Sequence, residues 1–207
     1  MTDTDIWADR HRNSKSLPME EWLRDGAVLV REAFKYACED VGLVWGKVDI
    51  HEELFDSAVK ALNNVNLNMK LYVSQVYGMA WTMMRFYKIQ DNSAASVFPG
   101  GLILDDLGTG KTIKALLAIC GISYMMGWND SINLENKDNC SVVVVPDVLV
   151  ATDVWMHHAA ILFKSSGIVA HITNARMFPK HFPMVAIMDL KLFSNKNKPT
   201  FLEVRTH

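Results

Sequence analysis

The stretch that decides the fold is residues 100–112, which read GGLILDDLGTGKT, and an apolar run follows it over residues 113–122. A short aliphatic segment enters a tight glycine turn, and a helix is predicted to begin at a lysine and a threonine. Glycines allow the backbone N–H groups of such a turn to point inward, and the N-terminus of the helix adds the positive end of its dipole. The stretch therefore predicts a phosphate-binding loop between a strand and a helix.

The predicted loop has the residues that a nucleotide and a magnesium ion need. We expect Lys111 to reach the β- and γ-phosphates of the nucleotide, and the Thr112 hydroxyl to coordinate Mg²⁺. Asp105 stands where the strict pattern G-x-x-x-x-G-K-[ST] has its first glycine. The remainder, Gly108-x-Gly110-Lys111-Thr112, is a form of the loop common in helicases. The departure at residue 105 therefore leaves the phosphate-binding prediction in place.

The composition is that of an ordinary globular protein. The chain has 207 residues, of which 50% are apolar and 21% are charged. This length accommodates one domain with a sizeable core, or one domain with a helical extension. The formal net charge is −2, so the chain carries no overall electrostatic footprint for nucleic acid. A contact with DNA would therefore depend on a local patch or on a partner.

The cysteines and the lack of long apolar runs in the sequence predict a soluble, intracellular protein. Cys38, Cys120 and Cys140 are odd in number, far apart and in no metal spacing, so we expect reduced and mostly buried thiols. Residues 1–16 are polar and mixed in charge, without the apolar core of a signal peptide. No apolar run of the sequence approaches the ~18 residues of a membrane span.

Helices are predicted before the loop, and residues 1–16 are predicted to be disordered. Apolar residues at helical spacing predict helices over residues 18–40, 49–64 and 66–87. Asp49 and Glu52 have the spacing of a capping box, in which the carboxylate of Asp49 would cap the second helix. The part of the chain before residue 65 is therefore predicted to be a tail and a helical extension.

Strands and helices are predicted to alternate after the loop. The prediction places helices over residues 111–126 and 147–163, strands over residues 141–145, 167–173 and 184–188, and a polar loop over residues 129–139. The β-branched run that ends at Pro146 is typical of a strand buried on both faces. Such alternation predicts an α/β fold with a parallel sheet covered by helices, and ligands bound beyond the C-terminal edge of its strands.

Three motifs resemble those of the Swi/Snf-type helicase-like ATPases, a family of chromatin remodellers. Residues 101–113, GLILDDLGTGKTI, resemble the family's motif I, whose acidic pair before the glycine loop is missing from most P-loop proteins. Residues 71–81, LYVSQVYGMAW, resemble its L-x-x-x-Q-x-x-G-x-x-W element. Residues 142–146, VVVVP, followed by Trp155, look like its motif Ia. The resemblance covers about residues 65–190.

The resemblance implies a fold, a ligand and a cellular role. The fold would be an incomplete RecA-like three-layer sandwich over residues 65–207, preceded by the tail and helical extension of residues 1–64. In the family the glutamine at the position of Gln75 reads adenine, because a carboxamide offers one donor and one acceptor. The implied cofactors are ATP and Mg²⁺, and the implied partner is duplex DNA or chromatin in the nucleus. The implied nucleotide-binding residues are Gln75, Asp106, Leu107, Gly108, Thr109, Gly110, Lys111 and Thr112, with Thr112 also the metal ligand.

One motif of the family has no counterpart in the sequence. Its Asp-Glu-x-His motif supplies the carboxylate that holds Mg²⁺ and the glutamate that activates the attacking water. After Thr112 the sequence contains no Asp-Glu pair. We therefore expect an ATP-binding fragment, similar to the N-terminal lobe of a DNA-dependent ATPase or helicase, that hydrolyses ATP very slowly.

Two other functions remain open at this point. The chain is alternatively a non-catalytic interaction module built on a truncated P-loop lobe, with the helices of residues 18–64 making the contact. It is alternatively a different P-loop NTPase, in which Asp189, at the end of an aliphatic strand, supplies the hydrolytic carboxylate.

Overall fold

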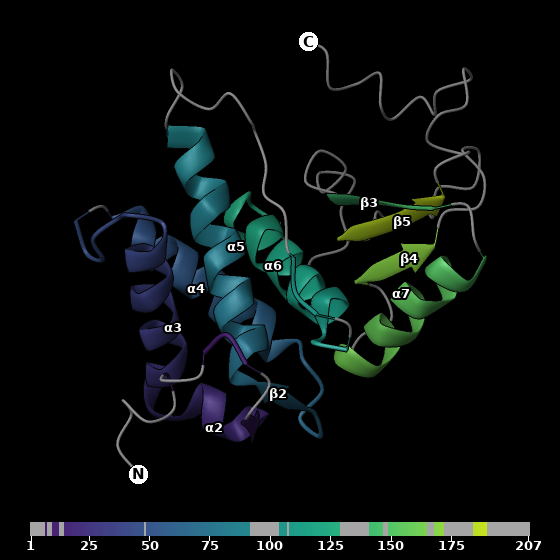
Figure 1. Cartoon of the computed structure of the whole chain (residues 1–207), viewed down its shortest axis with the longest axis horizontal. Coiled ribbons are helices and arrows are strands. Elements are labelled where there is room, and N and C mark those ends of the chain that lie inside the picture. Colours follow the sequence, from purple (N-terminus) through teal and green to yellow (C-terminus); the bar gives the residue numbers. More distant parts are fainter. Residues whose placement is uncertain are drawn as a thin grey trace. The chain divides into compact units, whose positions relative to one another are not determined.

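The computed structural model describes residues 7, 10–12, 15–47, 49–91, 104–106, 108–128, 141–146, 149–164, 168–171 and 184–189. Its elements form a mixed α/β fold that includes a small parallel sheet (Figure 1). The chain divides into two compact units, Met1–Met125 and Met126–His207. The helices before residue 65 therefore belong to the same unit as the helix that follows the glycine loop.

The first unit is mainly helical. Its elements are β1 (Ser16–Pro18), α2 (Met19–Leu23), the 3-10 turn η1 (Arg24–Gly26), α3 (Val28–Asp40), α4 (Ile50–Asn63), β2 (Lys70–Tyr72), α5 (Val73–Asp91) and α6 (Lys111–Met125). The helix predicted over residues 111–126 is confirmed as α6, and the helix predicted over residues 49–64 is confirmed as α4. The segment of residues 104–106 has no regular structure, and residues 100–103 of the predicted strand lie outside the described part.

Four helices of this unit form its core. Helix α3 packs on α5, α5 on α6, α6 on α4, and α4 on α3 (Figure 1). Their facing side chains, among them Phe34, Leu54, Met79 and Leu117, are completely buried. Gly121 allows α6 to approach closely, because a Cβ at this position would lie 2.5 Å from Met83 Sδ. The helix that follows the glycine loop is therefore held firmly by apolar packing.

The predicted single helix over residues 18–40 is wrong, because the chain breaks between α2 and α3. Asp25, Gly26 and Ala27 adopt φ of 51°, 73° and 60°, in the left-handed region. The backbone N–H of Ala27 donates to the carbonyl of Arg24 at 2.9 Å and closes the turn. Asp25-Gly26 is a dipeptide typical of turns, so the local sequence carried a signal for this break that the helical spacing concealed, whereas the left-handed angle of Ala27 is unusual for a residue with a Cβ.

The predicted helix over residues 66–87 begins later than expected, at Val73. Before it, β2 pairs antiparallel with β1, and Leu17 lies opposite Leu71. The indole Nε1 of Trp22 donates to the Leu71 carbonyl at 3.3 Å. Leu71 is therefore a buried strand residue rather than part of a helical face.

The predicted capping box of α4 is also wrong. Asp49 has helical backbone angles and makes no side-chain capping hydrogen bond. Glu52 instead pairs with Arg31 Nη1 of α3 at 2.6 Å, and the Arg31 guanidinium lies 4.0 Å from the centre of the Phe55 ring. A contact between helices has thus replaced the local contact that the spacing predicts.

Part of the N-terminal stretch packs on the helices, in contrast to the disorder predicted for it. Trp7 is only 1% exposed, and its ring meets those of Trp22 and Tyr36 at centroid distances of 6.2 and 5.8 Å. Arg10 forms an ion pair with Asp40 at 3.4 Å. These contacts tie Trp7 and Arg10 of the N-terminal segment to α2 and α3.

The second unit contains a parallel sheet, which confirms that prediction. Its elements are β3 (Ser141–Val145), α7 (Leu149–Leu162), β4 (Val169–His171) and β5 (Val185–Asp189). The strand order is β3-β5-β4, both pairings are parallel, and α7 packs on β4 and β5. Residues 129–139 of the predicted polar loop lie outside the described part.

The burial of the strands differs from the prediction in one respect. We expected β3 to be buried on both faces, but Val144 is 38% exposed and only Val145 is buried. The central strand is β5, whose residues 185–188 are completely buried. Within the described residues, no helix is long and apolar enough to cross a membrane.

Candidate nucleotide-binding site

The predicted phosphate-binding loop runs into α6 through two glycines in left-handed conformations. Gly108 has φ of +81° and Gly110 has φ of +77°, values that residues with a Cβ rarely adopt. The N–H of Lys114 donates to the Gly110 carbonyl at 3.0 Å, so Gly110 immediately precedes α6 and its carbonyl accepts the first hydrogen bond of the helix. The first backbone N–H groups of α6 have no acceptor within the helix and are available for an anion.

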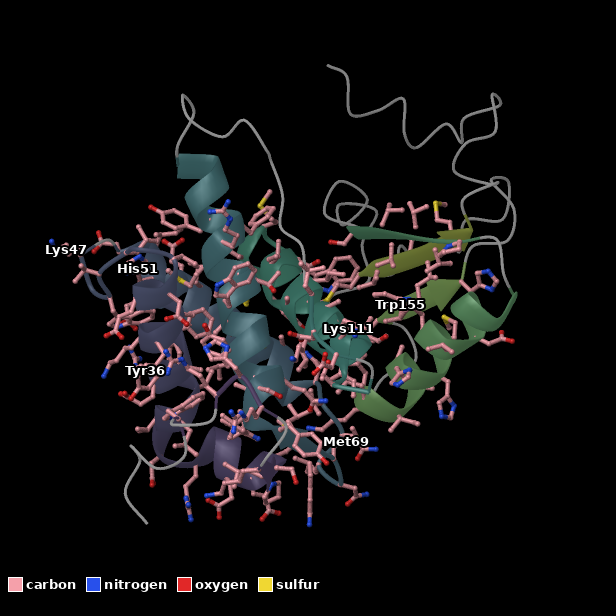
Figure 2. All side chains as sticks on the ribbon, in the orientation of Figure 1. Tyr36, Lys47, His51, Met69, Lys111 and Trp155 are labelled. Carbon is pink, nitrogen blue, oxygen red and sulfur yellow. The ribbon has the colours of Figure 1, made fainter. Side chains whose placement is uncertain are left out.

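The side chain of Lys111 curls back over the loop that precedes it. It lies at the start of α6 (Figure 2), and its Nζ donates to the carbonyls of Asp105 and Asp106 at 2.8 and 2.7 Å. Thr109 Oγ1 donates to the same Asp106 carbonyl at 2.9 Å. These bonds bring an ammonium group to the loop, which is the charge that a phosphate requires.

Gln75 also reaches the loop, although it lies 35 positions before Gly110 in the sequence. It belongs to the first turn of α5 and is only 4% exposed. Its Oε1 accepts a hydrogen bond from the backbone N–H of Tyr72 at 2.9 Å. Its Nε2 lies so close to Gly110 that a Cβ there would collide with it. The structure thus brings together Gln75 and the glycine turn, which are separate in the sequence.

Asp105 and Lys114 form a partly buried ion pair beside the loop. Lys114 Nζ lies 2.5 Å from Asp105 Oδ2, and the side chain of Lys114 is 5% exposed. The stem of Lys114 passes over Gly78, where a Cβ would lie 2.8 Å from Lys114 Cδ. Lys114 was not predicted to lie at the site, since a lysine three residues after Lys111 looks like an ordinary surface residue of a helix.

The remaining predicted ligands are placed as follows. Asp106 is exposed, and Thr112 is half-buried in the first turn of α6. Leu107 lies outside the described residues. Among the described residues, no group of three or more His, Cys, Asp or Glu side chains is arranged to hold a metal ion. Magnesium usually keeps several waters and is held by one or two protein oxygens and the phosphates, so a single hydroxyl of Thr112 fits that chemistry.

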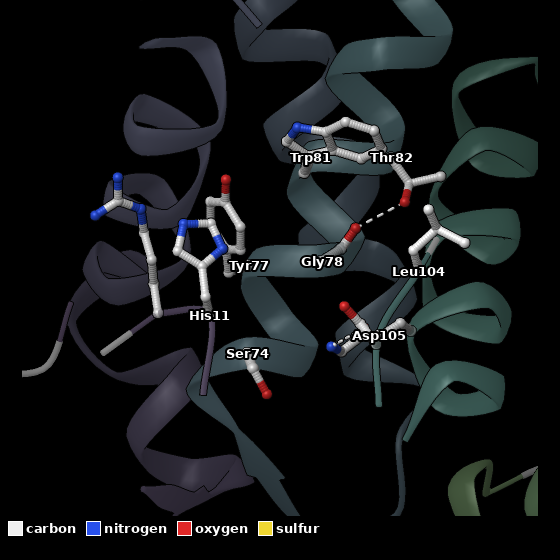
Figure 3. Close-up of a pocket in the computed structure, with 10 residues that line it drawn as sticks. His11, Ser74, Tyr77, Gly78, Trp81, Thr82, Leu104 and Asp105 are labelled. Atoms are coloured by element: carbon white, nitrogen blue, oxygen red, sulfur yellow. Dashed lines mark hydrogen bonds and ion pairs between the residues drawn. The ribbon is translucent and has the colours of Figure 1, made fainter. Parts of the chain in front are cut away.

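A cavity of about 220 Å³ adjoins the loop. Asp105 lines it together with residues of α5 and of the N-terminal segment (Figure 3). Burial alone would raise the pKa of the nearby Asp40, but hydrogen bonds from Tyr77 and Arg10 outweigh it and lower that pKa. Burial and the bond to Asp40 raise the pKa of Tyr77. The segment that carries Arg10 is therefore anchored by charged hydrogen bonds.

The candidate residues of the second unit lie at the end of the sheet and on α7. Asp189 ends β5 and pairs with Val145 of β3, so both lie at the C-terminal edge of the parallel strands. Trp155, part of the expected motif Ia, is half-buried on α7. This arrangement agrees with the edge at which parallel sheets bind ligands.

Two of the three cysteines have the expected environment. Cys38 and Cys120 are buried and form no disulfide. Burial raises the pKa of the Cys38 thiol to about 11, and it also raises the pKa of Cys120. Both are therefore protonated and inert near neutral pH. Cys140 lies outside the described residues.

Comparison of the sequence with protein-family models and with curated proteins finds no match, and comparison of the structure with solved structures finds none either.

Proposed function

We propose that residues 106–112 bind the phosphates of ATP together with Mg²⁺. One arrangement carries this proposal: Gly108 and Gly110 adopt positive φ immediately before α6, while Lys111 Nζ is held by two carbonyls of the same loop. Positive φ turns the backbone of this segment so that it accommodates an anion, and the helix N-terminus and the ammonium supply positive charge. Such a combination favours a di- or triphosphate over a neutral ligand.

The wider assignment is a part of a RecA-like lobe similar to that of Swi/Snf-type ATPases. The parallel order β3-β5-β4 and the strand–helix–strand connection through α7 support it, since RecA-like lobes are built from such units. The proximity of Gln75 and Gly110 supports it as well, because the motif resemblance requires both at one site. By the same resemblance we propose duplex DNA as the partner and the nucleus as the location.

We propose that these 207 residues alone bind ATP but turn it over very slowly. The sequence after Thr112 contains no Asp-Glu pair to hold Mg²⁺ and activate water. In related phosphoryl transfers, an arginine finger supplied by a second lobe raises the rate by a factor of about 10³–10⁵. The resemblance covers only about residues 65–190, so it includes no second lobe. If Asp189 were instead the hydrolytic carboxylate, Asp189→Asn would abolish whatever turnover the wild type has.

Thermal unfolding with and without Mg-ATP tests the binding proposal. At a ligand concentration of about 100 times Kd, binding stabilises the native state by ~2.7 kcal/mol, which raises Tm by on the order of 5 °C. We expect this shift in the wild type and its loss in Lys111→Ala. The matched control is Lys60→Ala, which removes an exposed helical lysine of the same unit and should keep the shift.

The opposite result has a definite meaning. A wild type whose Tm does not respond to Mg-ATP, in a protein that unfolds cooperatively, would contradict nucleotide binding. It would favour the interaction module, in which the helices before residue 65 provide a docking surface.

A further inference from the structure

One turn near the N-terminus docks on a surface that three helices share. The backbone N–H of Arg10 donates to the Trp7 carbonyl at 3.2 Å, which is the i to i+3 bond of a single helical turn. Residues three positions apart in such a turn lie on the same face. Trp7 and Arg10 accordingly both contact side chains of α2, α3 and α5. We call residues 7 and 10–12 the N-terminal turn.

The ring of Trp7 is the apolar anchor of this turn, and it is almost completely buried. The rings of Trp22 on α2 and Tyr36 on α3 lie at centroid distances of 6.2 and 5.8 Å from it. Trp22 is itself fixed in place, because its indole N–H donates to the Leu71 carbonyl. The two rings therefore form a preformed site for a third aromatic side chain.

The guanidinium of Arg10 is the charged anchor. Its Nη2 lies 3.4 Å from Asp40 Oδ1 on α3, and its central carbon lies 5.0 and 5.8 Å from the ring centres of Tyr36 and Tyr77. The hydroxyl of Tyr77 donates to the other carboxylate oxygen of Asp40, so the carboxylate is already oriented. A carboxylate between two aromatic rings favours a planar cation, which is what arginine supplies.

The ring of His11 adds a weaker contact. It meets the Tyr77 ring edge to face at 4.9 Å (Figure 3), and its Nε2 lies 3.9 Å from Asp40 Oδ2. The side chain is 65% exposed, so it gains little from burial. The residues that receive the turn are Trp22, Tyr36, Asp40 and Tyr77, and we call them the docking surface. Their chemistry fits a tryptophan followed three positions later by an arginine.

The docking of the turn leaves two polar groups unsatisfied. Trp7 Nε1 and Arg10 Nε are buried and have no acceptor among the described residues. A donor that has lost water without gaining an acceptor offsets part of the free energy of the other contacts. The turn is therefore bound less tightly than its aromatic and ionic contacts alone would make it. Its attachment to the chain compensates, because a tethered segment has an effective concentration in the millimolar range.

We propose that the docking surface is an exchangeable peptide-binding site. The N-terminal turn occupies it within the chain, and a Trp-x-x-Arg turn of a separate polypeptide takes its place. The bound turn supports this, because its two anchors meet rings and a carboxylate that other contacts already hold in position. Short helical segments commonly bind through such spaced anchors. None of these residues belongs to the proposed phosphate site, so the two proposals are tested separately.

Fluorescence anisotropy of a labelled synthetic peptide with the sequence of residues 1–16 tests this exchange. In the full chain, Trp7→Ala combined with Arg10→Ala vacates the docking surface. We expect this variant to bind the peptide about tenfold more tightly than the wild type, whose own turn competes at a millimolar effective concentration. The variant Arg10→Ala alone changes a side chain that is 25% exposed, and it should show a severalfold gain even if the double variant folds poorly.

Changes on each side of the contact locate the bound peptide. In the vacated variant, Asp40→Asn should weaken peptide binding severalfold, because the arginine of the peptide loses its counter-charge. The matched control is Asp56→Asn, which changes an exposed aspartate of α4 and should leave binding unchanged. A peptide with 3-benzothienylalanine in place of Trp7 keeps the ring shape without the N–H. It should bind more tightly, since it removes the unpaired donor.

Several results would overturn the exchange. If Arg10→Ala, folded as judged by circular dichroism, binds the peptide no better than the wild type does, the turn is a fixed part of the fold. If a peptide of the same composition in scrambled order binds equally well, or if Asp40→Asn has no effect, the binding does not occur at the docking surface. The phosphate proposal is unaffected in each case, because Lys111 and the glycine turn take no part in these measurements.

Discussion

At the scale of the residue, the loop depends on two glycines whose roles differ. Both Gly108 and Gly110 have positive φ, which favours glycine. Of the two, only Gly110 also has a side chain close to it, that of Gln75. At Gly108, a Cβ would meet no heavy atom of the described residues within 4 Å. A substitution at Gly110 therefore combines backbone strain with a collision, and a substitution at Gly108 brings the strain alone.

Replacing Gly110 with alanine is expected to cost more than the same change at Gly46. Both residues have similar φ, +77° and +79°, so both variants carry about 1–2 kcal/mol of backbone strain. Only Gly110→Ala also displaces the Gln75 amide, and it should lose ATP binding as well. Urea unfolding and titration with Mg-ATP measure the two effects. Equal losses of stability in the two variants would contradict the contact between Gln75 and Gly110.

The ion pair of Asp105 and Lys114 should respond asymmetrically to mutation. Asp105→Asn leaves the Lys114 ammonium, which is 5% exposed, without its counter-charge, at an expected cost of about 2 kcal/mol after allowing for solvent at Asp105. Lys114→Met keeps an unbranched side chain over Gly78 and leaves Asp105 for water to solvate, so it should cost less than about 1 kcal/mol. Urea unfolding measures the loss of stability in each variant. A larger loss in Lys114→Met than in Asp105→Asn would show that the ammonium is solvated.

At the scale of the element, the sequence predicted helices and strands whose pattern lies within one segment. It did not predict features that depend on contacts between segments. The periodicity of residues 111–126 and the β-branched run before Pro146 identified α6 and β3, because each depends on its own residues. The break at residues 24–27 escaped prediction because apolar residues at helical spacing continue on both sides of the Asp25-Gly26 turn dipeptide. Likewise, β2 needs its partner β1, which lies more than 50 residues earlier.

The same distinction holds for the site. Glycines, lysine and threonine in one short run predicted the loop, because phosphate chemistry fixes their spacing. Lys114 was missed, since its importance depends on α5 lying beside the loop, where the lysine stem passes over Gly78. The capping box at Asp49 failed because Glu52 contacts Arg31 of another helix.

The packing of α4 against its neighbours predicts a pH dependence through His51. This side chain is completely buried, stacks on Trp45 at 5.3 Å, and its Nδ1 accepts from the Gly46 N–H at 3.2 Å. Burial lowers the pKa of His51 below its ordinary 6.5, although Glu52 acts in the opposite direction. The folded state therefore favours the neutral ring, while the unfolded state takes up a proton as the pH falls below about 6.5.

We expect the free energy of unfolding to decrease between pH 7 and pH 5. His51→Asn keeps an acceptor near Gly46 without a titrating ring, so its stability should vary less over the same interval. His157→Ala, which changes an exposed histidine of α7, serves as the control, and its free energy of unfolding should vary with pH as that of the wild type does. Urea unfolding at several pH values measures the free energy of unfolding. If this free energy falls as steeply with decreasing pH in His51→Asn as in the wild type, the pH dependence does not come from His51.

At the scale of the whole molecule, the chain consists of two compact units that divide after Met125. The loop, Gln75 and the cavity all belong to the first unit. The parallel sheet and Asp189 belong to the second. The residues proposed for binding are thus separated along the chain from the one candidate for hydrolysis.

Residues 1–125 alone are expected to fold and to bind Mg-ATP with an affinity within a few fold of that of the full chain. The four packed helices provide an apolar core of their own, and the proposed ligands come from this part. Circular dichroism and titration measure folding and binding. A fragment that folds with the expected helix content but binds more than about tenfold more weakly would show that the second unit contributes to the site.

The passage of Lys114 over Gly78 has a consequence for evolution. A Cβ at residue 78 would lie 2.8 Å from the lysine stem, so the two positions are sterically coupled. Descendants of this chain should acquire alanine at residue 78 only after a shorter side chain has become established at residue 114. The opposite order passes through a destabilised ancestor, which selection removes because native proteins have only a small stability margin.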